Sequence, residues 1–359
     1  MYNPQFFETL CPVIKKVIPD FGERRFVYAV FDKVWPDLEL KQRTRHVTKA
    51  FGACLPNDYP KAIEHVVYIC KLLQEQNHTR SKYPFIFLPD YIEQYGLDHF
   101  DLSMRAIEES TKLISAEFAI RPFIEKYPAQ TMAVMLKWSK HPHAAVRRLS
   151  SEGCRPRLPW GMGLPFLKKD PSPILPILEN LKNDPSDSVR RSVANNLNDI
   201  AKDYPDIALQ IAKEWKGISP ETDWIIKHGC RTLLKRGHAT ALRLHGLNPK
   251  AKGEIKKLRI TDKVVIGNDL NFEFEFASKE KTACVFRLDY MIEYVTRTGS
   301  ISKKIFRITE DSFEPGKSIL FKRKKSFADY STRVHFKGIH RLRIMANGVE
   351  LATTGFNVQ

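Results

Sequence analysis

Paired cysteines are missing from this chain. Its six cysteines stand singly, at positions 11, 54, 70, 154, 230 and 284, and no CxxC pair occurs. A zinc ribbon or a redox dithiol needs such pairs, so both are excluded. Isolated cysteines in a chain of 359 residues are typical of reduced core residues in a cytosolic protein.

Long apolar stretches are missing too. No run of about 18 apolar residues occurs, so no membrane span is expected. The N-terminal MYNPQFFETL lacks the apolar core of a signal peptide. Also absent are the GxxxxGKS/T and GxGxxG nucleotide motifs, the GxSxG of serine hydrolases and the HExxH of metalloproteases. His141 and His143 have no third ligand nearby, which favours a helix-cap or phosphate-contact role over a metal site. We expect no metal and no cofactor.

Acidic residues are outnumbered by basic ones. There are 58 lysines and arginines against 41 aspartates and glutamates, a formal net charge of +17. Such a balance favours a polyanionic partner, with nucleic acid first, although surplus lysines can also serve solubility alone. A hydrophobic content of 43% indicates folded domains rather than disorder.

One turn-plus-helix pattern occurs twice. HPHAAVRRLSSEGCRPRLPW, residues 141–160, and NDPSDSVRRSVANN, residues 183–196, each place a proline turn before a valine and two arginines. Their matching residues are about 43 positions apart, the spacing of HEAT-like helical repeats. Residues 1 to about 80 indicate further helices broken by prolines, and residues 102–120 a clear helix. The later helices are expected at residues 132–139, 144–152, 173–181, 188–202, 207–215 and 223–235.

Composition changes near residue 248. From there apolar and polar residues alternate with period two, as in DLNFEFEFAS and ACVFRLDYMIEYV, and Asn-Gly and Pro-Gly turns follow. Two domains suit this length. We therefore expect a mainly α fold, a HEAT-like α-solenoid (ARM-type superhelix) over residues 1–247, followed by an immunoglobulin-like β-sandwich over residues 248–359.

Carboxylates lie on the basic faces of the repeat helices. Glu152 is four residues after Arg148, and Asp199 is eight after Arg191, so each shares a helix face with an arginine. A surface built only to bind phosphate gains nothing from carboxylates. The alternative is ordinary ion pairing, of Glu152 with Arg148 and of Asp199 with Arg191 or Lys202. The next helix is expected to add Lys227, Arg231 and Lys235 to the same surface.

Two more residues are candidates. Glu117, in the apolar segment ISAEFAIRPFI, is either a buried partner of Arg121 or a site residue. Trp160, in the Pro/Gly-rich loop RPRLPWGMGLP, either packs in the core or faces a cleft. Trp138, Trp215 and Trp224 lie on apolar helix faces and are expected in the core.

Taken in order, ISAEFAIRPFI, HPHAAVRRLSSEGCRPRLPW and DPSDSVRRSVANNLNDIAKDYP resemble the DNA alkylation repair glycosylases built on HEAT-like repeats, and their AlkC branch in particular. The resemblance covers residues 1 to about 245, and one subgroup of that branch carries a C-terminal immunoglobulin-like domain. It implies a cytoplasmic enzyme of the bacterial cytosol or nucleoid. The implied activity is removal of 3-methyladenine and 3-methylcytosine from duplex DNA by a monofunctional glycosylase, without base flipping. It implies these catalytic positions: Glu117, Arg148, Glu152, Trp160 and Asp199.

The chemistry of an N3-methylated base explains why carboxylates are needed at the site. N3-alkylation makes the base a cationic leaving group, so positive charge develops on the deoxyribose as the N-glycosidic bond breaks. Carboxylates stabilise that oxocarbenium-like state and can orient water, and Trp160 can attract a charged base. A non-catalytic HEAT-repeat scaffold for DNA or protein is the alternative.

The expected partner is double-stranded DNA containing alkylated bases, bound by a monomer. A second basic cluster at residues 322–325 is either a DNA clamp, which would make the β-domain an accessory clamp, or a strand edge protected by lysines. The expected DNA-binding residues are Arg147, Arg191, Lys227, His228, Arg231, Lys235, Lys322, Arg323, Lys324 and Lys325.

Overall fold

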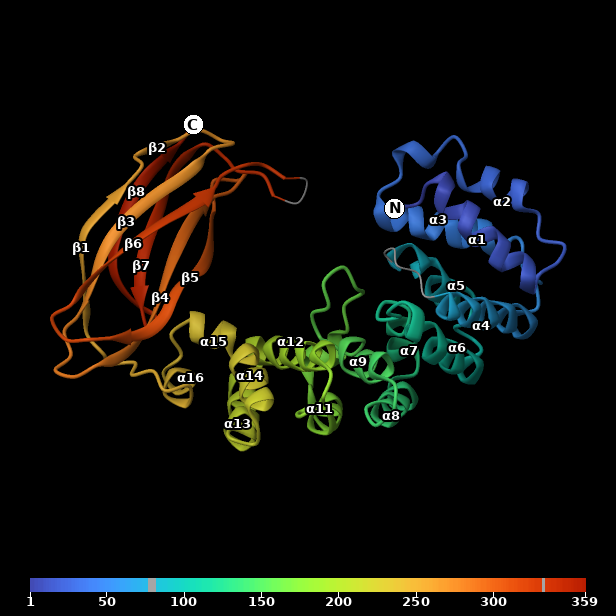
Figure 1. Cartoon of the computed structure of the whole chain (residues 1–359), viewed down its shortest axis with the longest axis horizontal. Coiled ribbons are helices and arrows are strands. Elements are labelled where there is room, and N and C mark those ends of the chain that lie inside the picture. Colours follow the sequence, from blue (N-terminus) through green and yellow to red (C-terminus); the bar gives the residue numbers. More distant parts are fainter. Residues whose placement is uncertain (77–81, 331–332) are drawn as a thin grey trace. The chain divides into compact units, whose positions relative to one another are not determined.

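A computed structural model describes residues 1–76, 82–330 and 333–359 of the chain. Its described helices end at Leu244 and its first strand begins at Gly253 (Figure 1). Contacts divide the chain into two compact units, Met1–Asp203 with Trp215–Gly229, and Tyr204–Glu214 with Cys230–Gln359. Residues 77–80 of the predicted N-terminal helical region lie outside the described residues. The functional division at residue 248 stays a prediction.

The first part of the helical region follows its prolines and polar caps. Pro4 and Pro60 occupy first-turn positions, where the missing N–H costs nothing, and Asn3 and Asp58 cap the same helices by accepting backbone hydrogen bonds. Prolines therefore begin these helices more than they break them. The helices are α1 (Pro4–Val17), α2 (Glu23–Val30), α3 (Leu40–Gly52), α4 (Tyr59–Glu75), α5 (Phe87–Tyr95) and α6 (Phe100–Leu113).

The repeat helices follow. Val146 and Leu149 of α9, like Val189 and Leu197 of α12, are completely buried, as their spacing predicts. Helix α12 packs against both α9 and α14, so equivalent helices of successive repeats lie side by side. The helices are α7 (Arg121–Lys126), α8 (Pro128–Trp138), α9 (Ala144–Glu152), α10 (Pro165–Lys169), α11 (Leu175–Leu181), α12 (Asp187–Asp203), α13 (Pro205–Trp215), α14 (Pro220–Gly229), α15 (Arg231–Lys235) and α16 (Ala239–Leu244).

Two expected helices are shorter than the sequence pattern predicts. The helix expected over residues 102–120 ends at Leu113, because Ile114 adopts an extended backbone with φ −145° and ψ 136°. Ala116 and Ile120 of the following turn are also buried, so the apolar pattern continues past the helix end. The helix expected over residues 223–235 is divided at Cys230 into α14 and α15.

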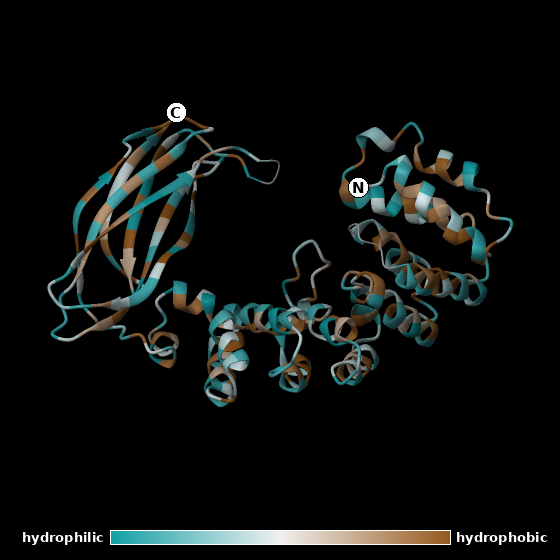
Figure 2. Ribbon diagram, in the orientation of Figure 1, coloured by the Kyte–Doolittle hydropathy of each residue, from teal (hydrophilic) through white to brown (hydrophobic). Residues whose placement is uncertain are grey.

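The C-terminal domain is a two-sheet β structure. Sheet β1–β3–β6 and sheet β2–β8–β7–β4–β5 are antiparallel except for β2 and β8, and their inner residues share one apolar core that includes Phe274, Phe286 and Ile344. Figure 2 shows hydrophilic and hydrophobic residues alternating along these strands. The strands are β1 (Gly253–Ile260), β2 (Lys263–Val264), β3 (Asp269–Ser278), β4 (Cys284–Val295), β5 (Ile301–Phe313), β6 (Ser318–Ser326), β7 (Gly338–Ala346) and β8 (Val349–Val358).

Candidate active site

Glu117 lies in the turn between α6 and α7, where it meets the basic face of α9. Arg148 donates hydrogen bonds from Nη1 to Glu117 Oε2 at 2.9 Å and to Ser115 Oγ at 2.8 Å. Ser115 donates in turn to Glu117 Oε2 at 2.8 Å. The partner of Glu117 is therefore Arg148 rather than Arg121, and the turn and α9 fix the carboxylate together.

A single arginine joins Glu152 and Asp199. Arg155 Nη1 donates to Glu152 Oε1 at 2.6 Å, and its Nε donates to Asp199 Oδ2 at 3.0 Å. Asp199 also accepts from Lys202 Nζ at 3.0 Å, and Arg148 Nη2 lies 3.9 Å from Glu152 Oε1. The ion pairs expected of ordinary helix faces are thus present, but Arg155 supplies the shortest contact to Glu152. Its place three residues after Glu152 was the available sequence signal, and sequence reasoning missed it.

The three carboxylates differ in access to solvent. The exposed fraction of the side chain is 19% for Glu117, 7% for Glu152 and 2% for Asp199. Burial acts to lower the pKa of Arg155, but the charges of Glu152 and Asp199 outweigh it and raise that pKa. The result is a chain of alternating charges in which Glu117 is the most open carboxylate.

Trp160 occupies a strained turn on the loop after α9. The N–H of Gly161 donates to the carbonyl oxygen of Leu158 at 3.2 Å, with Pro159 between them and a φ of 63° at Trp160. This is the pattern of a type II turn, whose third position normally takes glycine. A side chain there costs about 1–2 kcal/mol. Trp160 is 60% exposed, so the core-packing alternative is wrong for this residue.

Arg121 holds the loop that carries Trp160. Its side chain is fully buried, and it donates from Nη1 to the carbonyl oxygens of Gly153 at 2.7 Å and Arg155 at 3.0 Å, and from Nε to that of Met162. Burial lowers the pKa of Arg121 to about 10. These contacts fasten both ends of the loop to the start of α7.

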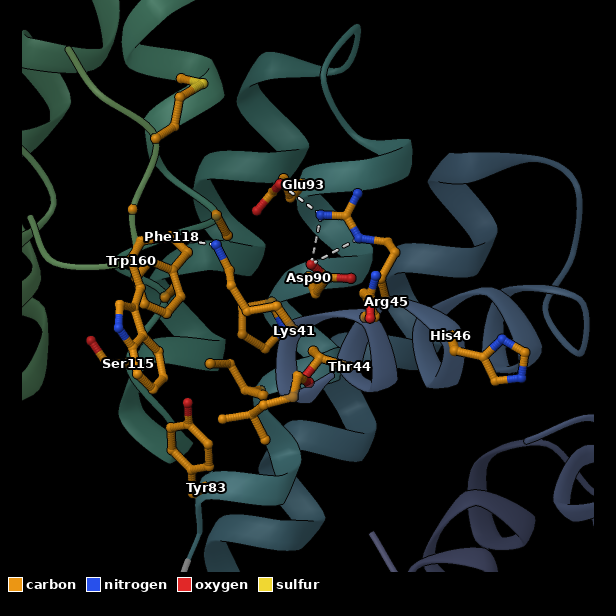
Figure 3. A pocket seen from close by; sticks show the side chains of 18 of the residues that line it. Lys41, Thr44, Arg45, His46, Tyr83, Asp90, Glu93, Ser115, Phe118 and Trp160 are labelled. Carbon is orange, nitrogen blue, oxygen red and sulfur yellow. Dashed lines mark hydrogen bonds and ion pairs between the residues drawn. The ribbon is translucent and has the colours of Figure 1, made fainter. Parts of the chain in front are cut away.

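A cavity of about 670 Å³ opens beside Trp160. Figure 3 shows Phe118 and Trp160 on one side of it and an ion-paired cluster on the other. In that cluster Arg45 Nη2 lies 2.9 Å from Asp90 Oδ1 and 2.8 Å from Glu93 Oε1. The cavity therefore has an aromatic wall and a charged wall, and Ser115, which donates a hydrogen bond to Glu117, is among its lining residues.

His143, directly before α9, caps that helix. His143 Nδ1 accepts a hydrogen bond from the N–H of Ala145 at 3.2 Å, which confirms the helix-cap interpretation. Within residues 1–76, 82–330 and 333–359, no group of three or more His, Cys, Asp or Glu side chains is placed to hold a metal ion. No helix in the same ranges is long and apolar enough to cross a membrane.

Several expected DNA-binding residues are already engaged within the protein. Arg147 forms a two-point ion pair with Asp184, with distances of 2.6 and 3.0 Å, and the Asp184 side chain is only 4% exposed. Arg191 is 67% exposed and pairs with Asp187 at 2.7 Å. Arg191 therefore remains open to a phosphate, whereas Arg147 has a structural partner.

The basic side chains of α14 lie beside an exposed tryptophan. Lys227 is exposed, and the ring of His228 stacks on Trp224 with centroids 5.0 Å apart. Trp224 is 40% exposed, so its expected core position is wrong, whereas Trp138 and Trp215 are buried as expected.

Arg231 and Lys235, on α15, belong to the second compact unit. Burial lowers the pKa of Lys235, while the charge of Asp289 acts to raise it. The membership of Lys235 in a surface shared with Arg148 stays a prediction.

The basic cluster of residues 322–325 lies on β6, an edge strand of the three-stranded sheet. Strand alternation divides it between two faces. Lys322 and Lys324 are exposed and lie 3.4 Å from Glu273 and 3.3 Å from Asp269. The other two are half-buried, with Lys325 over the ring of Phe306 and Arg323 over that of Phe321.

Comparisons with known proteins cover both parts of the chain. The family model described as "Uncharacterised protein YhaZ, C-terminal Ig-like domain" matches residues 254–359, and the HEAT repeat model matches residues 174–204. The protein YhaZ of Bacillus subtilis (strain 168) is 40% identical over 359 residues, which are 100% of this chain and 98% of YhaZ.

A solved structure is similar over the same extent. It is the alkylpurine DNA glycosylase AlkC of Pseudomonas fluorescens, bound to DNA containing an abasic site analog. The two chains share 34% identity and a TM-score of 0.90, with coverage of 99% of this chain and 98% of that one. This chain therefore belongs to the AlkC branch of the DNA alkylation repair glycosylases built on HEAT-like repeats, and the expectation of an enzyme, a hydrolase of the DNA N-glycosylase class, is confirmed.

Proposed function

We propose that this protein is a monofunctional DNA glycosylase that excises cationic N3-alkylated bases, 3-methyladenine and 3-methylcytosine, from duplex DNA. The observation that supports this most is the set of three carboxylates held by Arg148 and Arg155, of which Glu117 is bonded to Ser115 in the wall of the cavity that the exposed Trp160 also lines. Family membership adds that AlkC of Pseudomonas fluorescens, named an alkylpurine DNA glycosylase, was solved with an abasic site analog.

The carboxylates act on the sugar. As the N-glycosidic bond breaks, the electron pair leaves with the cationic base, which departs neutral, and positive charge develops at C1′ of the deoxyribose. Glu117 is the most open of the three, so it lies against the sugar and orients the attacking water. Glu152 and Asp199, held by Arg155, extend the negative field that stabilises the oxocarbenium-like state. Water adds to C1′ and gives up one proton, which Glu117 accepts and passes to solvent.

Trp160 and Arg148 face the lesion. The exposed indole attracts the charged base through its π-face, which discriminates against neutral bases. Arg148, fixed by Glu117 and Ser115, lies where a flanking phosphate can accept a further hydrogen bond. In this proposal the base stays in the duplex, because the acids need only reach the sugar.

The rest of the basic surface holds the duplex. A net charge of +17 favours association with the phosphate backbone. We place the enzyme on DNA as a monomer whose helical region, residues 1–247, follows a superhelical course, with residues 248–359 as an accessory clamp. The proposed phosphate contacts outside the site are Arg147, Arg191, Lys227, His228, Arg231, Lys235, Lys322, Arg323, Lys324 and Lys325.

Release of free bases tests the proposal. Duplex DNA treated with a methylating agent is incubated with the enzyme, and released bases are separated by chromatography and identified by mass. We expect 3-methyladenine and 3-methylcytosine to appear at a rate that depends on enzyme concentration, while DNA carrying uracil, a neutral base, releases nothing. If neither methylated base were released, the proposed activity would be contradicted.

A further inference from the structure

The turn that presents Trp160 is held from outside its own repeat. Lys41, near the start of α3, donates a hydrogen bond from Nζ to the carbonyl oxygen of Trp160 at 2.6 Å, across 119 residues of sequence. The same ammonium lies 5.4 Å from the centre of the Phe118 ring. Figure 3 shows the lysine side chain reaching toward the two aromatic residues.

The backbone of the loop is otherwise fixed at its ends. Arg121 binds the carbonyl oxygens of Gly153, Arg155 and Met162. Arg157 forms a two-point ion pair with Asp203, in which its Nη2 lies 2.6 Å from Oδ1. None of these contacts reaches the peptide of Trp160 itself, which is the strained residue of the loop. The described contact to that peptide's oxygen comes from Lys41.

We propose that Lys41 is a positioning residue that holds Trp160 in its left-handed conformation and so presents the indole to the DNA. The role given to the indole rests on the proposed function. A charge-assisted hydrogen bond to a carbonyl oxygen is stronger than a neutral one, which suits it to oppose backbone strain. Strained residues at functional sites persist only where surrounding contacts over-determine them. Without Lys41, the Trp160 backbone is free to return to an ordinary negative φ and the ring leaves its position.

Five variants separate this role from a simple loss of positive charge. Lys41→Met keeps the length of the side chain and removes the donor, and Lys41→Arg keeps a donor. Lys61→Met removes the same charge from an exposed position on α4 that is not among the residues lining the cavity. Trp160→Ala removes the ring that Lys41 is proposed to position. The double variant, Lys41→Met with Trp160→Ala, completes a double-mutant cycle.

Three measurements are made. The first two are the single-turnover release rate of 3-methyladenine and the Kd for duplex DNA carrying an abasic analogue. The third is the indole N–H spectrum of the protein, which has five tryptophans, with the Trp160 signal assigned from its absence in Trp160→Ala. The spectrum reports on the turn even in protein without DNA, so a failure of the proposed activity stays distinguishable from a failure of this inference.

We expect Lys41→Met to shift or broaden the Trp160 indole signal and to lower the release rate roughly tenfold. Lys41→Arg should keep at least half of the wild-type rate, and Lys61→Met should change the rate less than twofold. In the Trp160→Ala background, Lys41→Met should cause no further loss. An unchanged indole signal, an equal loss in Lys61→Met, or a full additional loss in the double variant would each overturn the proposal.

Discussion

Asp199 and Glu152 share Arg155, which makes their exchange for amides informative. Asp199→Asn and Glu152→Gln keep the shape of each side chain and remove one negative charge. We expect either change to lower base release from alkylated duplex DNA at least about 100-fold, because less negative charge faces the oxocarbenium-like state. The Kd for DNA should stay within threefold, since the basic surface is unchanged.

Asp187→Asn is the matched control for Asp199→Asn. Asp187 lies at the start of the same helix, α12, where its side chain is 58% exposed. The Asp187→Asn variant should release the methylated bases at the wild-type rate. Wild-type rates in Asp199→Asn and Glu152→Gln, with melting temperatures unchanged, would remove these acids from the mechanism.

Trp160 is predicted to trade stability for activity. Glycine adopts a φ of 63° without steric cost, and the indole is mostly exposed, so Trp160→Gly should leave the free energy of unfolding unchanged or raise it by up to about 1 kcal/mol. Base release should fall because the aromatic face is lost. Met162→Gly, in the same loop at an exposed residue, should lower the unfolding free energy instead. Chemical denaturation of both variants measures the contrast, and a clear loss of stability in Trp160→Gly would contradict the strain argument.

At the scale of elements, strand β6 presents only half of its basic cluster to solvent. Lys322→Gln together with Lys324→Gln should weaken DNA binding and reduce the slope of log K against log salt by about 2, roughly one unit for each phosphate that the protein no longer neutralises. Lys303→Gln with Lys304→Gln, exposed on β5, serves as the control and should leave the slope unchanged. An unaltered slope in the β6 variant would favour the alternative, in which these lysines only protect a strand edge.

Elements also show where sequence patterns fail. The spacing of Val189, Val193 and Leu197 predicts α12 to within one residue at each end, because helix period and burial agree there. The same reasoning extends α6 through Glu117, because buried residues of the next turn continue the apolar pattern. A turn packed in the core carries the same hydrophobic residues as a helix, so the pattern alone does not mark the boundary.

For the whole molecule, the net charge predicts a steep salt dependence. We expect DNA affinity to fall at least about tenfold between 50 and 200 mM salt, as expected when several phosphates are neutralised. Fluorescence anisotropy with undamaged and abasic duplexes measures this, and light scattering should give the mass of one chain, 41.5 kDa. A DNA affinity that does not change with salt concentration would instead favour a protein-interaction scaffold.

The order of residues along the chain was enough to predict the two classes of structure and the repeat spacing, and it singled out Arg148 and Glu152 as candidate site residues. Local chemistry explains this: period 3.6 and period 2 are properties of neighbouring residues, and Arg148 with Glu152 share a face through helix geometry alone. The β-domain was predictable for the same reason, since each strand alternates along its own length.

Which charges meet depends instead on the packing of the folded chain. Arg155 joins acids on two helices, Arg148 binds Glu117 across 31 residues, and Lys41 reaches Trp160 across 119. Such pairings follow from how helices pack, and several partners satisfy the same spacing in sequence. The positive φ of Trp160 could not be predicted from the sequence either. A Pro-Trp-Gly segment permits several turn types, and the contacts of the folded chain select one of them.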